Sequence, residues 1–294
     1  MGGRKKKEVF NVCKKLIDLH THSTCSDGSM SPRELVRHAA SKGLAAIALS
    51  DHDSVAGVKD AMDEGKRVGV EVVPAIELSA LLSVPVFAAN DANNAALGEA
   101  WKGGGMGCDN MVLATLGTGV GGGIIIGGKP VSGAHGAGGE IGHTPLRKDE
   151  TEPCGCGKFG CAEQYCSATG VVRVTKRYLD AHDTPSVLRD LETLTAKDIF
   201  DAAKAGDAAA QEALEQVYDL MGQFLASICC VADPEVVVLG GGVSRAGQPL
   251  LDGTRKYFDR YVFHASRNTR FALASLGNDA GAYGAFKLAL DSVK

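Results

Sequence analysis

One histidine and three cysteines near the middle of the chain have the spacing of metal ligands. His143 is followed by Cys154, Cys156 and Cys161, with glycines between the cysteines. One imidazole and three thiolates form a tetrahedral set that structural zinc sites use. The glycines favour a loop wrapped around a metal over a packed core, and the alternative is a group of buried cysteines without a metal. The spacing predicts a structural zinc loop.

A second group of metal-ligating side chains lies early in the chain. It consists of an H-x-H pair and three later residues, namely His20, His22, Asp27, His52 and Glu77. Imidazoles and carboxylates together suit Zn, Mn or Fe, and clustered metals can activate water for phosphoester hydrolysis. The alternative is a set of loop caps and surface histidines. The group predicts a metal site if the fold brings its members together.

Two glycine-rich stretches could bind a nucleotide. The first, "GTGVGGG", offers backbone amides and one hydroxyl to phosphates, from Gly117, Thr118, Gly119, Gly121 and Gly122. The second follows an apolar run and suits a base or a ribose, at Gly240, Gly241 and Gly242. Glycine-rich hairpins often bind nothing, so a plain turn is the alternative for the first stretch. The second stretch is not a G-x-G-x-x-G fingerprint, which disfavours a Rossmann dinucleotide site there.

The hydrophobic pattern predicts the elements that position the early metal ligands. A strand at 16–20, a helix from a capping box at Ser31–Glu34, a strand at 44–50, a helix at 54–69 and a strand at 70–78 follow one another. In such a parallel β-α-β-α-β unit the carboxyl ends of the strands meet at one edge. The five candidate ligands follow those strand ends, so we expect them to gather there.

The pattern changes at residue 84. We expect a strand at 84–90, a helix at 91–101, two strands around the first glycine-rich stretch, mostly helix over 170–232, a strand from 235 and a closing helix at 279–293. Asn90 or Asp91 could cap the helix at 91–101. The whole chain is therefore predicted to be α/β.

Composition limits the function classes. The chain has 294 residues, 45% of them hydrophobic, and a net charge of −4, which gives no electrostatic reason to expect a nucleic-acid partner. No apolar run approaches membrane-spanning length and no signal peptide opens the chain, so we expect a cytoplasmic protein with no membrane partner. Cysteines in that compartment indicate metal binding or burial rather than disulfides.

The first part of the chain resembles a known family. "DLHTHSTCSDG", "ALSDHDSVAG" and "VVPAIELSA" are similar to the first three motifs of the PHP (polymerase and histidinol phosphatase) phosphoesterases. The resemblance covers about 16–80 and implies that the five early ligands belong to a PHP-type metal site. No later stretch resembles the remaining PHP motifs, and three strands cannot close a barrel of seven or eight. We therefore expect a partial barrel with an incomplete site.

The rest of the chain, from about residue 84, resembles the ROK family of bacterial sugar kinases and sugar-responsive repressors, and its glucokinases in particular. "VPVFAANDANNAALGEAW", "LGTGVGGGI", "GAGGEIGHTPL", "CGCGKFGCAEQYCS" and "DPEVVVLGGGVS" follow the family pattern in order. The resemblance implies the larger lobe of an actin-like ATPase fold with a zinc loop. It also implies ATP, Mg²⁺ and glucose or a related hexose as ligands.

The ROK resemblance assigns roles to individual residues. Asp91 would be the general base that takes the proton from the sugar 6-hydroxyl. The sugar hydroxyls would be bound by Asn90, Glu140, His143 and Glu163. The glycines of the first stretch would face the ATP phosphates, and Gly240–Gly242 the adenosine. The zinc loop would fix Glu140 and His143, so the metal would orient the sugar-binding side chains.

One family feature has no counterpart in this sequence. ROK kinases open with a D-x-G-G-T motif in a small lobe that holds phosphate and Mg²⁺, whereas here the PHP-like piece occupies that place. We therefore expect two domains, 1–80 and 81–294, with kinase activity impaired because phosphoryl transfer depends on positioning and charge. Apolar surface at the cut faces of both pieces would favour a homo-oligomer.

Four interpretations follow. The leading one is a glucokinase by ancestry, and the second is a metal-dependent phosphoesterase acting on nucleotide or RNA phosphates. The third is a non-catalytic sugar-binding protein, for which the βαβαβ start argues against DNA binding. The fourth is an accidental fusion without a selected function.

Overall fold

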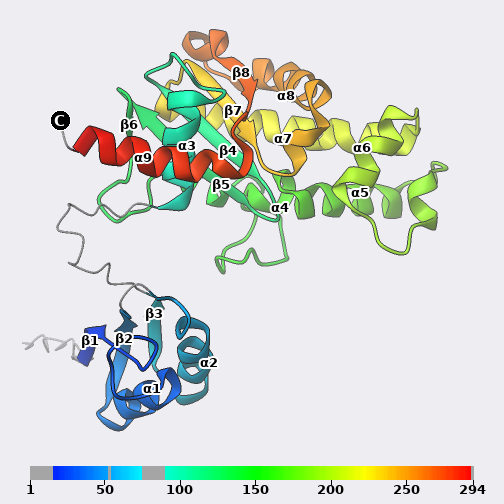
Figure 1. Ribbon diagram of the computed structural model, residues 1–294. Helices are drawn as coiled ribbons and strands as arrows, with labels where there is room; N and C mark the ends of the chain where they lie inside the picture. Colours follow the sequence, from blue (N-terminus) through cyan, green and yellow to red (C-terminus); the bar gives the residue numbers. More distant parts are fainter. Residues whose placement is uncertain (1–15, 52–53, 75–89, 293–294) are drawn as a thin grey trace, which may run out of the picture. The chain divides into compact units, whose positions relative to one another are not determined.

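The computed structural model describes residues 16–51, 54–74 and 90–292, and the chain divides into two compact units, Met1–Val86 and Phe87–Lys294 (Figure 1). Both units are α/β, as predicted. The expected strand at 84–90, except Asn90, and the end of the expected strand at 70–78 lie outside the described residues.

Unit 1 has the predicted β-α-β-α-β order. Its elements are β1 (Leu16–Thr21), α1 (Pro32–Ser41), β2 (Leu44–Leu49), α2 (Val58–Val68) and β3 (Glu71–Pro74). The strands form one parallel sheet in the order β1-β2-β3. Helix α2 begins at Val58 rather than at Ser54. The core of unit 1 lies between the helices and β2 and includes Val36, Ile47 and Leu49.

The capping box predicted at the start of α1 is confirmed. The Ser31 hydroxyl accepts a hydrogen bond from the Glu34 amide, and the Glu34 carboxylate accepts one from the Ser31 amide at 2.9 Å. Pro32 occupies the first helical position, where its missing amide hydrogen costs nothing. Gly43 ends the helix with φ of +72°, a conformation that favours glycine.

Unit 2 is built on a five-stranded sheet in the order β6-β5-β4-β7-β8. Its strands are β4 (Met111–Leu116), β5 (Val120–Ile126), β6 (Lys129–Pro130), β7 (Val236–Gly240) and β8 (Arg270–Leu273). Its α-helices are α3 (Asp91–Lys102), α4 (Glu163–Cys166), α5 (Ala168–Ala181), α6 (Ala196–Lys204), α7 (Ala208–Ala232), α8 (Gln248–Tyr261) and α9 (Ala280–Ser292). Short 3-10 helices include η2 (Ile141–His143) and η6 (Gly277–Asp279). Strands β4, β7 and β8 run parallel, and β5 is antiparallel to β4.

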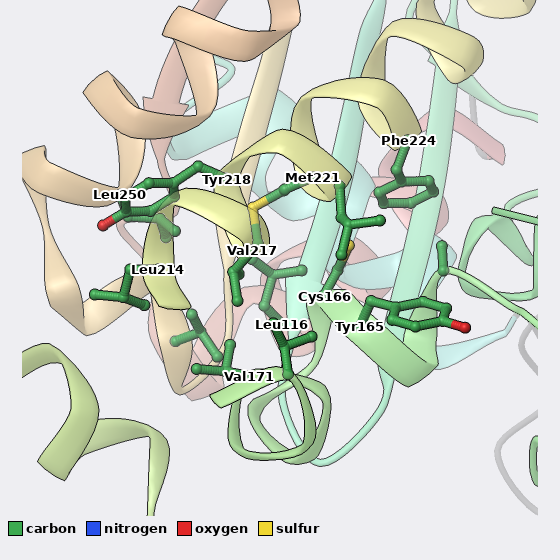
Figure 2. Close-up of a cluster of buried hydrophobic side chains, with 14 of the residues drawn as sticks. Leu116, Tyr165, Cys166, Val171, Leu214, Val217, Tyr218, Met221, Phe224 and Leu250 are labelled. Atoms are coloured by element: carbon green, nitrogen blue, oxygen red, sulfur yellow. The ribbon is translucent and has the colours of Figure 1, made fainter. Parts of the chain in front are cut away.

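Helices cover both faces of this sheet. Alternate residues of β4 point to opposite sides, so Met111 and Leu113 pack against α3 while Val112 and Leu116 pack in the larger core with α5 and α7. Figure 2 shows this larger core, in which Leu116 lies beside side chains from α4, α5, α7 and α8. The sheet is therefore packed on both faces, and the carboxyl ends of its parallel strands β4, β7 and β8 lie at one edge.

Helices α3 and α9 lie side by side and approach closely (Figure 1). A methyl group at Gly98 would lie 2.1 Å from the carbonyl oxygen of Ala280, and one at Gly284 would lie 1.7 Å from that of Asn94. Glycine at both positions is therefore required for the contact. Among the described residues, no helix has the length and hydropathy needed to cross a membrane.

Candidate active site and metal loop

The structure brings the predicted histidine and cysteines together. The ligand atoms of His143, Cys154, Cys156 and Cys161 all lie within 4.8 Å of one another. The Sγ of Cys154 is 3.7 Å from Nδ1 of His143, and the Sγ atoms of Cys156 and Cys161 are 3.6 Å apart. Ligands about 2.3 Å from a tetrahedral zinc ion are separated by about 3.8 Å, so these atoms fit a zinc ion.

Backbone hydrogen bonds hold this metal loop together. The amide of Cys154 donates to the carbonyl of Lys158 at 2.7 Å, and the amide of Gly157 donates to the carbonyl of Cys154 at 2.9 Å. Two antiparallel bridges, Pro145 with Cys161 and Pro153 with Phe159, close the loop on itself. The cysteines are thus presented by a hydrogen-bonded loop.

The three thiols differ in their environments. Burial raises the pKa of Cys161 to about 12 and also raises the pKa of Cys154. A backbone hydrogen bond at Lys158 lowers the pKa of the exposed Cys156. Since zinc binds cysteine as thiolate, a bound cation would stabilise the charged form of all three thiols.

Glu163 connects the metal loop to the glycine-rich turn. Its Oε2 accepts a hydrogen bond from the Val120 amide at 3.0 Å, and its Oε1 accepts one from the Cys154 thiol at 3.4 Å. A methyl group at Gly119 would lie 2.2 Å from Oε2, so glycine there makes room for the carboxylate. The predicted sugar ligand Glu163 therefore touches both features that the sequence singled out.

The turn in the first glycine-rich stretch is shorter than the sequence predicted. The turn comprises Gly117, Thr118 and Gly119, whereas Gly121 and Gly122 belong to β5 and pair with Thr115 and Ala114 of β4. The expectation that the later glycines lie in the turn is wrong. A methyl group at Gly122 would lie 2.3 Å from the Ile141 side chain, so this glycine admits η2 against the strand.

Residues at the N-terminus of α5 donate hydrogen bonds to the backbone carbonyls of that turn. The amide of Ala168 donates to the Gly117 carbonyl at 2.8 Å, and the Thr169 hydroxyl donates to the Thr118 carbonyl at 2.8 Å. The side chain of Thr118 is exposed. The arrangement fixes the turn from one side.

Helix α3 begins beside the same hairpin. Asn90 is its cap, because its Oδ1 accepts from the amides of Ala92 at 2.9 Å and Asn93 at 3.2 Å. Asp91 is the exposed first residue of the helix, so the cap position belongs to Asn90, although Oδ1 of Asp91 also accepts from the Ala92 amide, at 2.8 Å. Atoms of Ala92 lie 2.9 Å from a methyl group placed on Gly123, which puts this first turn over β5.

Asn93 is a site residue that the sequence reasoning missed. It is only 4% exposed, and its Oδ1 lacks a hydrogen-bond partner among the described residues. That atom lies 3.2 Å from the Cβ position of Gly139, the neighbour of Glu140. The signal was its place two residues after Asp91, on the buried side of the first helical turn. The start of α3, the Gly139–His143 segment, Glu163 and the turn thus converge on the β4–β5 hairpin.

A cavity of about 450 Å³ lies at the carboxyl ends of β4, β7 and β8. Gly240, Gly241 and Gly242 line it, as do Glu99 from α3 and Ser275 after β8. Ligands of open α/β sheets bind at this edge. The second predicted nucleotide stretch therefore borders a cavity large enough for a ligand.

Unit 1 contains part of the other predicted metal group. Nδ1 of His22 lies 2.8 Å from Oδ1 of Asp27, so the structure brings these two together. His20 lies on β1. His52 and Glu77 lie outside the described residues. The predicted five-ligand site remains a prediction.

Asp51 is a second residue that the sequence reasoning missed. It is 1% exposed and accepts hydrogen bonds from the Ser23 amide at 2.5 Å, the Ser23 hydroxyl at 2.7 Å and the Ser26 hydroxyl at 2.8 Å. It fixes the loop that carries His22 and Asp27 to the end of β2. Its signal was the first acid of "SDHDS", directly after an apolar strand.

Comparison with known proteins gives two family matches. The ROK family model matches residues 63–292, and the PHP domain model matches residues 18–103. Over 205 residues the chain is 43% identical to a glucokinase of Halalkalibacterium halodurans, covering 68% of this chain and 62% of that protein. Over 213 residues it is 37% identical to a glucokinase of Thermotoga maritima, covering 71% and 67%. The chain thus spans less than two thirds of the first relative's length.

A solved structure agrees with these matches. A ROK family glucokinase from Streptomyces griseus, crystallised with glucose and AMPPNP, superposes with a TM-score of 0.63 at 32% identity. The superposition covers 88% of this chain and 87% of that one. Fold and sequence therefore point to the same group of proteins.

Proposed function

This chain belongs to the ROK family, and on that premise we propose that residues 81–294 form the larger lobe of an ATP-dependent sugar kinase acting on glucose or a related hexose. Residues 1–80 are then a separate, PHP-like domain. The observation that carries the proposal is the convergence of the start of α3, the Gly139–His143 segment, Glu163 and the turn Gly117–Gly119 on one hairpin.

In this proposal Asp91 is the general base. A base must lie within hydrogen-bond reach of the proton it removes. Asn90 supplies the helix cap, and Oδ1 of Asp91 also accepts a hydrogen bond from the Ala92 amide, at 2.8 Å, so the other carboxylate oxygen of Asp91 would face the sugar. It would take the proton of the sugar 6-hydroxyl as that oxygen attacks the γ-phosphate of ATP, while bound Mg²⁺ would stabilise the phosphate charge.

The sugar would be held by Asn90, Glu140, His143 and Glu163, and zinc by His143 with the three cysteines. The support for the metal is that the four ligand atoms all lie within 4.8 Å of one another. Zinc would supply no chemistry to the transfer itself. Its effect would be to fix the ring of His143.

ATP would lie along the edge of the sheet, with its phosphates at the Gly117–Gly119 turn and its adenosine in the cavity beside Gly240–Gly242. The 294-residue polypeptide contains no D-x-G-G-T motif. We therefore propose that its kinase activity is far below that of a complete ROK kinase, since the missing groups position the phosphate and Mg²⁺.

The test is ATP-dependent phosphorylation of glucose by the purified full chain, followed through glucose 6-phosphate. We expect glucose and nucleotide binding with slow turnover. Turnover at the ordinary rate of kinases, about 1–100 per second, would contradict the proposed impairment. Absence of both glucose and nucleotide binding would contradict the kinase proposal itself.

A second candidate function is metal-dependent hydrolysis of nucleotide or RNA phosphates by unit 1. It is favoured by the PHP domain match and by the His22–Asp27 contact. The assay is hydrolysis of a nucleotide phosphate with added Mn²⁺, Zn²⁺ or Fe²⁺. Activity that persists after His20 and His22 are both replaced with Ala would exclude this site as its source.

Self-association is the remaining part of the proposal. Apolar side chains exposed on α9 include Tyr283, Phe286 and Leu290. Light scattering coupled to size-exclusion chromatography should give a mass above that of one chain, and a monomer at micromolar concentration would exclude the homo-oligomer.

A further inference from the structure

Glu99 carries a buried carboxylate that accepts hydrogen bonds from backbone amides. It is 1% exposed and lies in the last turn of α3. Its oxygens accept hydrogen bonds from the amides of Gly104 at 2.7 Å, Ser275 at 3.1 Å and Leu276 at 2.9 Å. A buried carboxylate is stable only when such donors replace its water, so these bonds hold the three amides in place.

The chain around Glu99 leaves space for this arrangement. A methyl group at Gly103 would lie 1.9 Å from Oε2 of Glu99, so a side chain at this position would displace the carboxylate. Gly104, the next residue, supplies the shortest of the three hydrogen bonds. Of the two glycines after α3, Gly103 therefore leaves room for the Glu99 carboxylate and Gly104 donates a hydrogen bond to it.

Two of the fixed amides belong to the stretch that borders the cavity at the strand ends. Ser275 follows β8, and with Gly277 and Asn278 it lines the cavity that Gly240–Gly242 also line. The carboxylate of Glu99 joins this wall to α3, although the two segments are more than 170 residues apart in sequence. The position of the wall thus depends on one side chain from the opposite end of the unit's sequence.

The same helix carries Asp91 at its first position. Glu99 is eight residues further along the helix, a distance of about 12 Å at 1.5 Å per residue. A helix of this length is rigid, so the wall of the cavity and the start of α3 are held at a fixed separation. In a phosphotransferase this separation sets the distance between the nucleotide and the base.

We propose that Glu99 is a positioning residue for the nucleotide: it fixes the Ser275–Leu276 wall of the adenosine cavity to the helix that carries the proposed base. The inference rests on the proposed kinase function. The ligand is the adenosine end of a nucleoside triphosphate, recognised by a wall that is already in place before binding.

The experiment compares Glu99→Gln with Glu235→Gln in the full chain. Glu235 also accepts two backbone amides, from Asp109 at 3.0 Å and Asn110 at 2.9 Å, but it precedes β7 at the end of that strand away from Gly240. Calorimetry measures the affinity for a non-hydrolysable ATP analogue and, separately, for glucose.

We expect Glu99→Gln to weaken nucleotide binding by about tenfold or more and to leave glucose affinity within about twofold, because the amide group offers hydrogens where the backbone amides need an acceptor. Glu235→Gln should change neither. A general loss of structure would weaken both ligands together. Equal nucleotide affinity of Glu99→Gln and the unchanged chain would overturn the inference while leaving the kinase proposal in place.

Absence of nucleotide binding by both the unchanged chain and Glu235→Gln would overturn the kinase proposal and the inference with it. Hydrogen exchange of the unchanged chain covers the case in which Glu99→Gln does not fold. We expect the amides of Ser275 and Leu276 to exchange as slowly as those of β7, although they lie outside any strand. Fast exchange at both amides would overturn the inference.

Discussion

Oε2 of Glu163 lies 3.0 Å from the amide nitrogen of Val120, which joins the residue after the metal loop to the first residue of β5. Its other oxygen accepts from Cys154, a member of the zinc-type cluster. A predicted sugar ligand, a predicted metal ligand and the glycine turn are therefore neighbours. A change at any one of them should be measurable at the other two.

Glu163→Gln tests this connection. Hydrogen bonds to a charged group contribute about 1.5–3 kcal/mol, so we expect the affinity for glucose to fall about 10- to 100-fold. The amide of Val120 should also exchange faster. Calorimetry and hydrogen exchange measure the two effects. Glu192→Gln, which changes an exposed glutamate of the same unit, should alter neither. Unchanged glucose affinity in Glu163→Gln would count against its role as a sugar ligand.

The metal loop predicts the zinc content. The full chain should contain about one zinc ion, since one histidine and three cysteines with ligand atoms within 4.8 Å of one another make up the four ligands of one ion. Cys156→Ser should reduce the content to near zero and lower the melting temperature, with elemental analysis and calorimetry as the measurements. The control is Cys230→Ser, which changes an exposed cysteine on α7 away from the cluster. Equal zinc contents in the two variants would contradict the assigned ligand set.

Asp91→Asn tests the general base. A positioned base contributes about 10²- to 10⁴-fold to the rate, so phosphorylation of glucose should fall by that factor. Glucose affinity and helix stability should change little, because Asn90 remains as the cap of α3. Initial rates at saturating ATP and glucose give the comparison. A rate within about threefold of the unchanged chain would place the base elsewhere.

Unit 1 should lose stability in acid through Glu64. Hydrogen bonds from Arg67, and then from Arg37, lower the pKa of Glu64 to about 2. A carboxyl whose pKa is lowered by folding stabilises the folded state above its ordinary pKa, and that contribution disappears as the pH falls from about 4.5 towards 2. Hydrogen exchange of peptides from 44–74, measured between pH 6 and pH 2.5, should show this loss.

The matched variant for the acid prediction is Glu64→Gln. It should exchange faster than the unchanged chain at pH 6, and the difference between the two should shrink as the pH falls. A difference that stays constant over this range would mean that the ion pairs with Arg37 and Arg67 do not contribute through charge.

The contact between α3 and α9 predicts a large effect of one methyl group. Gly284→Ala would place Cβ 1.7 Å from the Asn94 carbonyl oxygen, so we expect a loss of about 1–3 kcal/mol in the free energy of unfolding of unit 2. Gly281→Ala, on the same helix, meets no atom within 4 Å and should be neutral or stabilising. Urea unfolding compares them, and equal midpoints would contradict the close approach of the helices.

Features with a local cause could be predicted from the sequence. The capping box at Ser31 and the cap at Asn90 depend on residues within one helical turn, and both have local sequence signatures. The four metal-loop residues lie within one loop, so their spacing alone indicated their proximity. The apolar run before Gly240–Gly242 predicted the strand that became β7.

Features with a long-range cause could not be predicted. Glu99 and Asp51 look like ordinary acids of a helix and a loop, and only the folded chain brings distant amides and hydroxyls to their carboxylates. Gly121 and Gly122 resembled turn residues, although both lie in β5, where they pair with Thr115 and Ala114 of β4. Strand β8 has only four residues, too few for a hydrophobic period to be recognised, and it went undetected together with α8.

The strand order has a consequence for how the polypeptide acquires its structure during synthesis. Unit 1 pairs β1, β2 and β3 in the order in which they leave the ribosome. In unit 2 the central strand β4 pairs with β7, about 120 residues later, so this ladder closes only after most of the unit has been translated. We therefore expect unit 2 to fold more slowly than unit 1.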